Sequence, residues 1–262
     1  MKLFPKGKHR NRAILLAMIA TIVPLSQLFI IQIFTHAILH GDKSNIGKII
    51  ETFALFFGLF AVSHLATYWQ KTYRVTVFND AMKARGGWRS KSTESWVWAL
   101  SFETNNLVHT FTQVFVLAGF FIWVNWQAGL INLALVFLTL EVIRILFQRQ
   151  LVTQDEYTLA SKLKKPVDNM IKVSTRIKSA EIGTLVANAA FIAALAALLV
   201  LSYMNKINAT DAVLLFLGFR MQNTNLAQTS SSLMRFARAK ANSSAAHKYR
   251  HLKVEDDEED IE

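Results

Sequence analysis

The chain has 262 residues, of which 52% are hydrophobic, and it contains no cysteine, which excludes a disulfide framework and a thiolate metal site. Its formal net charge of +11 could suggest nucleic-acid binding, but the apolar residues cluster in blocks long enough to cross a ~30 Å hydrocarbon core. We therefore expect an all-α integral membrane protein that contacts membrane lipids and does not bind nucleic acid.

Six apolar blocks follow one another along the chain and predict six membrane-spanning helices. The first follows a basic leader, residues 1–12, and its apolar run is too long for a secretory signal peptide. The sixth is weaker because polar residues interrupt it. The blocks are 13–39, 49–69, 107–126, 128–147, 182–204 and 212 to about 228. We expect a six-helix domain over residues 13–245 and a disordered acidic tail over 246–262.

The distribution of Lys and Arg predicts how these helices are oriented. If all six blocks span and the N-terminus is cytoplasmic, 24 of the 29 Lys and Arg residues lie inside, 3 lie outside and 2 lie within blocks. This asymmetry is what the positive-inside rule requires. Both termini are therefore predicted to be cytoplasmic, and the expected location is a bacterial inner membrane.

The loops predicted to lie inside are long, and those predicted to lie outside are short. The two inner segments are expected to continue the spans as helices into the cytoplasm. Each contains a chain-breaking element near its middle, Gly86 and Gly87 in the first and Pro166 in the second. Between the third and fourth blocks, residues 125–129 predict a tight turn.

The sixth block carries polar residues at a depth where lipid-facing side chains should be apolar. Arg220, Asn223 and Thr224 recur at the spacing of one helix face. An unpaired Arg facing lipid is costly, so we expect this face to line a polar substrate pathway. The alternative is a polar contact between helices. Gln113, in the third block, is a further candidate for the pathway.

The fourth block contains an ionisable pair, Glu141 and Arg144, one helical turn apart. The simpler interpretation is that the two side chains neutralise each other near the membrane interface. The alternative is that Glu141 faces the pathway or pairs with Arg220.

Three further motifs carry weaker predictions. The fifth helix is rich in small residues, three of which repeat every four residues (Ala189, Ala193 and Ala197), and this predicts close packing. The other small residues are Gly183, Ala187, Ala190 and Ala194. His36 and His40 could share a metal, but no further ligand is assured nearby. The stretch "GDKSNIGK" lacks the spacing of a phosphate-binding loop. We therefore expect no catalytic site, metal or cofactor on this chain.

This layout resembles the transmembrane domain of the six-helix ABC exporters. Six spans, short outer loops and two long inner segments are that family's plan. The run "VDNMIKVSTRIKSAEIGT" resembles its entry into the fifth helix, and "NATDAVLLFLGFRMQNTNLAQTSSSLMRFARAKANSSAAHKYRHL" resembles its sixth. The resemblance implies that two such domains, alike or different, dimerise around a central pathway to which the sixth helices contribute.

The resemblance also implies a partner that hydrolyses ATP. In the family, short coupling helices in the inner segments contact an ATPase, and the matching ranges here are 83–89 and 162–168. The chain carries no ATPase motifs, so ATP would be used by a separate subunit. The expected function is that of a permease subunit, and the alternative is a non-transporting membrane scaffold or accessory subunit. The candidate contact residues are Gly86, Gly87, Trp88, Lys165 and Pro166.

Overall fold

The computed structural model describes residues 19, 22–35, 46–85, 91–162 and 167–259. All the elements in these ranges are helices, which confirms the predicted all-α class. A helix over Ile22–Thr35 is followed by five longer ones. These are α2 (Ile46–Arg85), α3 (Lys91–Val124), α4 (Trp126–Lys162), α5 (Asn169–Tyr203) and α6 (Ala209–Glu259).

Four helices are long and apolar enough to cross a membrane, as expected of an integral membrane protein. They correspond to the second to fifth predicted spans. The Ile22–Thr35 helix is shorter, and the polar residues of α6 lower its hydropathy, so the first and sixth spans stay predictions. The four spans are Ile50–Gln70, Ser95–Val124, Trp126–Ser161 and Asn169–Tyr203.

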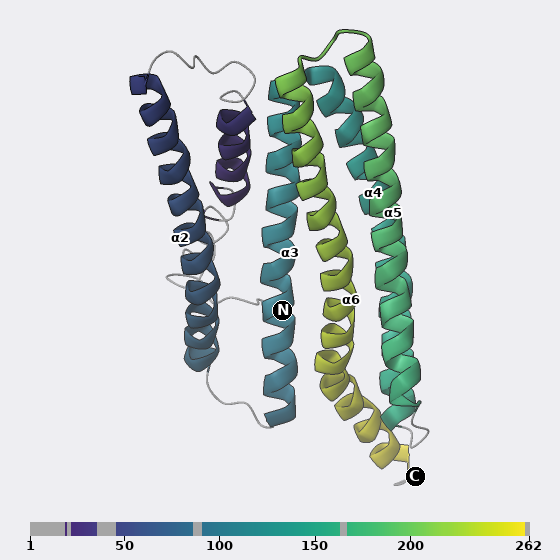
Figure 1. Cartoon of the computed structure of the whole chain (residues 1–262). Helices are drawn as coiled ribbons and strands as arrows, with labels where there is room; N and C mark the ends of the chain where they lie inside the picture. The colour runs from purple at the N-terminus through teal and green to yellow at the C-terminus, as the bar shows by residue number, and fades with distance from the viewer. Residues whose placement is uncertain (1–18, 20–21, 36–45, 86–90, 163–166, 260–262) are drawn as a thin grey trace.

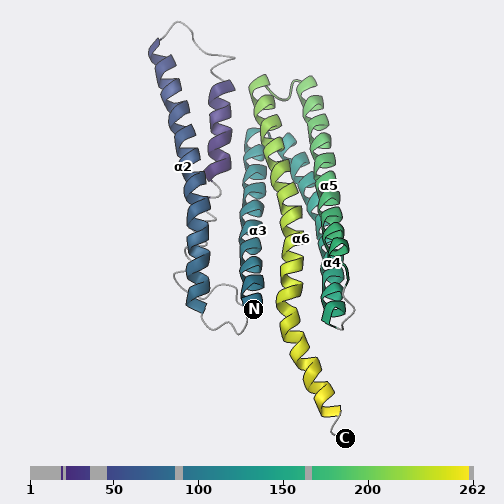
Figure 2. The same cartoon turned by 60° about the horizontal axis from the view of Figure 1, so that its bottom comes forward.

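Helices α3 to α6 form a bundle in which α6 contacts the other three (Figure 1). Among the labelled helices α2 contacts only α3, and the Ile22–Thr35 helix lies between α2 and the bundle (Figures 1 and 2). The α3–α4 and α5–α6 turns lie at one end, which we call the turn end. At the opposite, extended end, α6 projects beyond the other helices (Figure 2). Its 51 residues make it ~77 Å long.

The α3–α4 turn is tighter than predicted, because α4 begins directly after Asn125. The Asn125 side-chain oxygen accepts a hydrogen bond from the Ala128 amide at 3.0 Å and so caps α4. Its side-chain nitrogen donates to the Lys206 carbonyl at 3.2 Å, which ties this turn to the α5–α6 turn. Gly129 lies against the backbone of Ile122, where a Cβ would overlap it.

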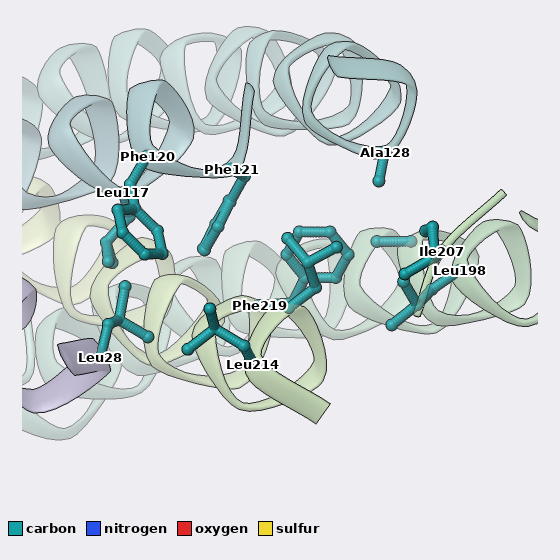
Figure 3. Close-up of a cluster of buried hydrophobic side chains, with 11 residues drawn as sticks. Leu28, Leu117, Phe120, Phe121, Ala128, Leu198, Ile207, Leu214 and Phe219 are labelled. Atoms are coloured by element: carbon teal, nitrogen blue, oxygen red, sulfur yellow. The ribbon is translucent and has the colours of Figure 1, made fainter. Parts of the chain in front are cut away.

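The main apolar core lies near the turn end, around the fully buried Phe121 of α3 (Figure 3). Its ring meets Phe219 of α6 edge to face, with centroids 4.9 Å apart, a favourable geometry for aromatic pairs. Gly218 lies beneath the same ring, and a Cβ there would overlap it. Leu28 joins this core, so the Ile22–Thr35 helix packs on the bundle through apolar contacts.

Helix α5 packs on α6 through small residues, but the buried face is not the predicted one. Ala189 and Ala193 are exposed. Gly183 allows the closest approach, because a Cβ there would overlap the Ser230 side chain. The prediction that small residues of this helix allow close packing is confirmed, but the residues of the four-residue repeat are not the buried ones. The buried small residues are Gly183, Ala187 and Ala194.

The two inner segments are helical as far as they are described, since α2 continues to Arg85 and α4 to Lys162. The acidic tail differs from the prediction, because α6 continues as a helix to Glu259. Ala, Leu, Lys and Glu are good helix formers, so an established helix extends readily through them. Several predicted features lie outside the described residues: the leader 1–12, His36, His40, Gly86, Gly87, Trp88, Lys165 and Pro166.

Candidate functional site

The polar residues that interrupt α6 point to different sides, and Gln222 is the most deeply buried of them. Its side-chain nitrogen donates to the Val114 carbonyl of α3 at 3.1 Å. Its side-chain oxygen accepts from Asn132 of α4 at 2.7 Å. Next to it, Asn223 donates to the side-chain oxygen of Asn188 on α5 at 2.8 Å. Part of the polar stretch is therefore a clamp between helices, which was the alternative interpretation.

A different side of α6 carries Arg220, Thr224 and Ser231, which we call the α6 face. Arg220 and Thr224 are exposed, and the Thr224 hydroxyl donates to the Arg220 carbonyl at 3.1 Å. Because α6 begins at Ala209, Arg220 lies ~16 Å along it, a position within the depth of a hydrocarbon core if α6 is the predicted sixth span. In a single chain this guanidinium is exposed, and lipid would be a costly neighbour for it if α6 spans the membrane.

Glu141 and Arg144 form an ion pair on α4. Arg144 Nε donates to Glu141 Oε2 at 2.8 Å, and both side chains are about half exposed. Within the described residues Glu141 is therefore paired with Arg144 and not with Arg220. The pair is the simpler of the two predicted arrangements, and it leaves the charge of Arg220 to be balanced by something other than Glu141.

Gln113, the predicted pathway residue of the third block, lines a separate polar cleft of about 320 Å³. The cleft lies between the Ile22–Thr35 helix, α2, α3 and α6, and it contains no residue of the α6 face. Gln228 lines it from α6 and His109 from α3. The candidate pathway residues therefore do not gather in one place. Arg220 and Thr224 share the open α6 face, Asn223 bonds α5, Glu141 pairs with Arg144 on α4, and Gln113 lines the cleft.

Two polar contacts connect the helices around this cleft. The side-chain nitrogen of Gln70 on α2 lies 3.0 Å from Nδ1 of His109 on α3. Towards the extended end, Arg235 Nε donates to Glu103 Oε1 at 2.7 Å, and Arg235 Nη2 donates to the Ser232 hydroxyl at 2.9 Å. Glu103 is buried, with 7% of its surface exposed, so this ion pair joins α3 to α6 with the carboxylate largely out of water.

Sequence reasoning missed Asn132, Gln70, His109 and the Glu103–Arg235 pair. Asn132 could have been found, because it is an isolated amide within an apolar block. The others lie at or beyond the ends of blocks. Polar residues are ordinary there, so their type alone could not show that they converge.

The sequence matches no protein-family model and no curated protein. The resemblance to ABC exporters therefore rests on the layout of helices, loops and charges. The geometry offers two features for function, the open α6 face and the polar cleft.

Proposed function

We propose that this chain is a membrane-spanning permease subunit that moves a substrate by alternating access, with ATP hydrolysed by a separate subunit. The observation that carries the proposal is the α6 face, which exposes Arg220 and Thr224. With α6 as the sixth span, both residues lie at the depth of a hydrocarbon core. A guanidinium at this depth is stable when it faces water or protein and costly when it faces lipid.

A second copy of the chain, or a similar domain, covers the α6 face and keeps Arg220 away from lipid. Two copies placed about a two-fold axis would each present Arg220 to the other. Like charges in direct contact repel, so the arrangement favours a water-filled space between the α6 faces over a dry interface. Since Glu141 is already paired with Arg144, an anionic group on the substrate is the natural partner for Arg220.

Six spans and cytoplasmic termini complete the proposal. The ATPase would then dock on the inner segments at 83–89 and 162–168. The experiment that tests the proposal is mild detergent extraction of the tagged full chain from its native membrane, followed by identification of the proteins that co-purify. We expect an ATPase subunit and ATP hydrolysis by the complex. A stable complex that contains no ATPase would contradict it.

The second candidate is a non-transporting scaffold subunit. It is favoured by the use of Gln222 and Asn223 to hold helices together, because this assigns part of the polar stretch to packing. The substitution Arg220→Leu separates the two candidates. A permease should keep its partner and lose substrate-stimulated ATP hydrolysis, whereas a scaffold that uses Arg220 as a contact should lose its partner.

A further inference from the structure

We propose that three arginines towards the extended end, Arg176 of α5 and Arg235 and Arg238 of α6, form a binding site for a phosphate monoester group. We call these residues the arginine cluster. Its two α6 members follow Ser231 at the spacing of one helix face and so continue the α6 face. They lie at least ~22 Å along α6 from Arg220, so the cluster is a separate site and the proposal does not depend on transport.

The packing of α5 on α6 brings the cluster to one level of the bundle. Asn223 of α6 donates to Asn188 of α5 at 2.8 Å, and the Ser230 hydroxyl of α6 donates to the Ala180 carbonyl of α5 at 3.2 Å. A step back along α5 therefore matches a step forward along α6. Continued by one further turn, this register places Arg176 level with the two α6 members, whose charges act on it.

The positive charge of the cluster is only partly compensated. Glu103 of α3 is bonded to Arg235 at 2.7 Å, and among the described residues it is the carboxylate whose charge acts on Arg176. Three guanidinium groups against one carboxylate leave two positive charges in excess. A phosphate monoester carries roughly two negative charges at neutral pH and would balance them.

Two of the guanidinium groups also have hydrogen-bond donors to spare. Neither Arg176 nor Arg238 donates a side-chain hydrogen bond to any described residue. Arg238 Cζ lies 5.4 Å from the centre of the Trp96 ring, and a guanidinium stacked on a ring keeps the N–H groups at its edge available. Arg176 is half-buried, so it has lost part of its water without gaining an acceptor. Phosphate oxygens match the donor fork of Arg and would supply these acceptors.

The depth of the cluster fits the phosphate layer of a bilayer. Arg176 lies ~40 Å along α5 from the turn end, and α5 is one of the four helices able to cross a membrane. A bilayer with its headgroups is about 40–45 Å thick. With the turn end at one surface, Arg176 reaches the headgroups of the opposite leaflet. The phosphate monoester of a lipid such as phosphatidate and that of a soluble compound can both reach this level.

A neighbouring lysine separates a built site from general positive charge. Lys178 also lies on α5, two residues from Arg176, and it is exposed. Two residues correspond to about 200° around a helix, so Lys178 points to the opposite side at nearly the same depth. An anion held only by the overall positive charge of this end would respond equally to the loss of either residue.

The test uses the full chain in phosphatidylcholine nanodiscs, without nucleotide and at constant ionic strength. One arm titrates glycerol 3-phosphate by calorimetry. The other adds phosphatidate to the nanodiscs and measures, by native mass spectrometry, the lipid that the chain retains. We expect a phosphate monoester to bind in at least one arm. Arg176→Gln and Arg238→Gln should each weaken binding about tenfold or more, because each removes a charged donor. The matched control Lys178→Gln should not.

A further variant distinguishes loss of the ligand contact from loss of the fold. Arg176→Lys keeps the charge without the fork, so its affinity should lie between those of the wild type and Arg176→Gln. Retention of phosphatidate identifies a lipid ligand, and binding of glycerol 3-phosphate alone identifies a soluble one; both support the site. Absence of binding in both arms, equal weakening by Lys178→Gln, or full affinity in both glutamine variants would overturn it. These outcomes are independent of whether an ATPase co-purifies.

Discussion

Gln222 lies where α3, α4 and α6 meet, and both ends of its carboxamide are used. It is 1% exposed, accepts from Asn132 and donates to the Val114 carbonyl. Apolar lipid gives no hydrophobic drive to bring helices together, so packing and such interhelical bonds decide which helix pairs form. The polarity of α6 around Gln222 is therefore partly structural.

Replacing Gln222 with Leu should lower the free energy of unfolding by about 1–2 kcal/mol, because Asn132 loses its acceptor and the Val114 carbonyl loses a side-chain donor. The double variant with Asn132→Leu should be milder than the sum of the single ones, with a coupling of about 0.5–1.5 kcal/mol. Reversible unfolding in mixed micelles measures this. Thr224→Val, on the exposed face, is the control and should change little. Strict additivity would show that the two amides do not act together.

The ion pair between Glu103 and Arg235 makes a separate prediction. Arg235→Leu leaves the buried Glu103 carboxylate without its guanidinium and should cost about 1–3 kcal/mol of stability, less than for a fully buried pair because Arg235 is 46% exposed. Adding Glu103→Gln should recover part of the loss in the same unfolding assay. A double variant less stable than Arg235→Leu would contradict this, because the unpaired carboxylate could then not be the source of the loss.

Sequence spacing placed Arg220, Asn223 and Thr224 on one face, and the structure divides them. Positions three residues apart differ by about 60° around a helix, which is enough to turn Asn223 towards Asn188 while Thr224 stays exposed. The residue types showed that polar contacts or a cavity were needed. They could not show where α5 lies, and that position decides which residues are bonded and which remain open.

At the scale of the helices, close approach of α5 and α6 depends on Gly183. Gly183→Ala should lower the free energy of unfolding by about 1–3 kcal/mol, because the new Cβ overlaps Ser230. The matched control is Gly119→Ala, where a Cβ meets nothing within 4 Å and helix propensity favours Ala. Adding Ser230→Gly to Gly183→Ala should remove the overlap and restore part of the stability, because Gly itself costs about 1 kcal/mol in a helix and the Ser230 bond to the Ala180 carbonyl is lost. Equal behaviour of the Gly183 and Gly119 variants in thermal unfolding would contradict the crossing described here.

The four central spans were predictable because apolar blocks of about 20 residues are typical of membrane helices and rare in soluble proteins. Helical continuation past these blocks was also expected for the two inner segments, and α2 reaches Arg85 and α4 reaches Lys162, each shortly before a predicted chain-breaking element. The exact helix ends, such as Lys91 for α3 and Asn169 for α5, were not predictable from the blocks. The polar turns of these extensions carry no hydropathy signal. Likewise, the turn between α3 and α4 consists of Asn125 alone and not of the predicted residues 125–129. The capping side chain of Asn125 and the small Gly129 are enough to reverse the chain.

At the scale of the whole molecule, the orientation in the membrane is open to direct measurement. A cysteine at Asn208, in the turn before α6, should react with an impermeant thiol reagent added outside intact cells. A cysteine at Ser161, near the end of α4, should react only after permeabilisation. The expectation comes from the asymmetric distribution of Lys and Arg. Reaction of Ser161→Cys from outside would overturn the predicted topology.

The central claim is that the α6 face lines a wet pathway whose access alternates. The measurement is impermeant-reagent labelling of Thr224→Cys in right-side-out and inside-out vesicles carrying the complete complex, with and without ATP. The matched control is Ile192→Cys, an exposed α5 position ~16 Å from the turn end. We predict that Thr224→Cys reacts from one side without ATP and from the other during hydrolysis, while Ile192→Cys, facing lipid, reacts from neither. Protection of Thr224→Cys from both sides in both conditions would contradict the claim.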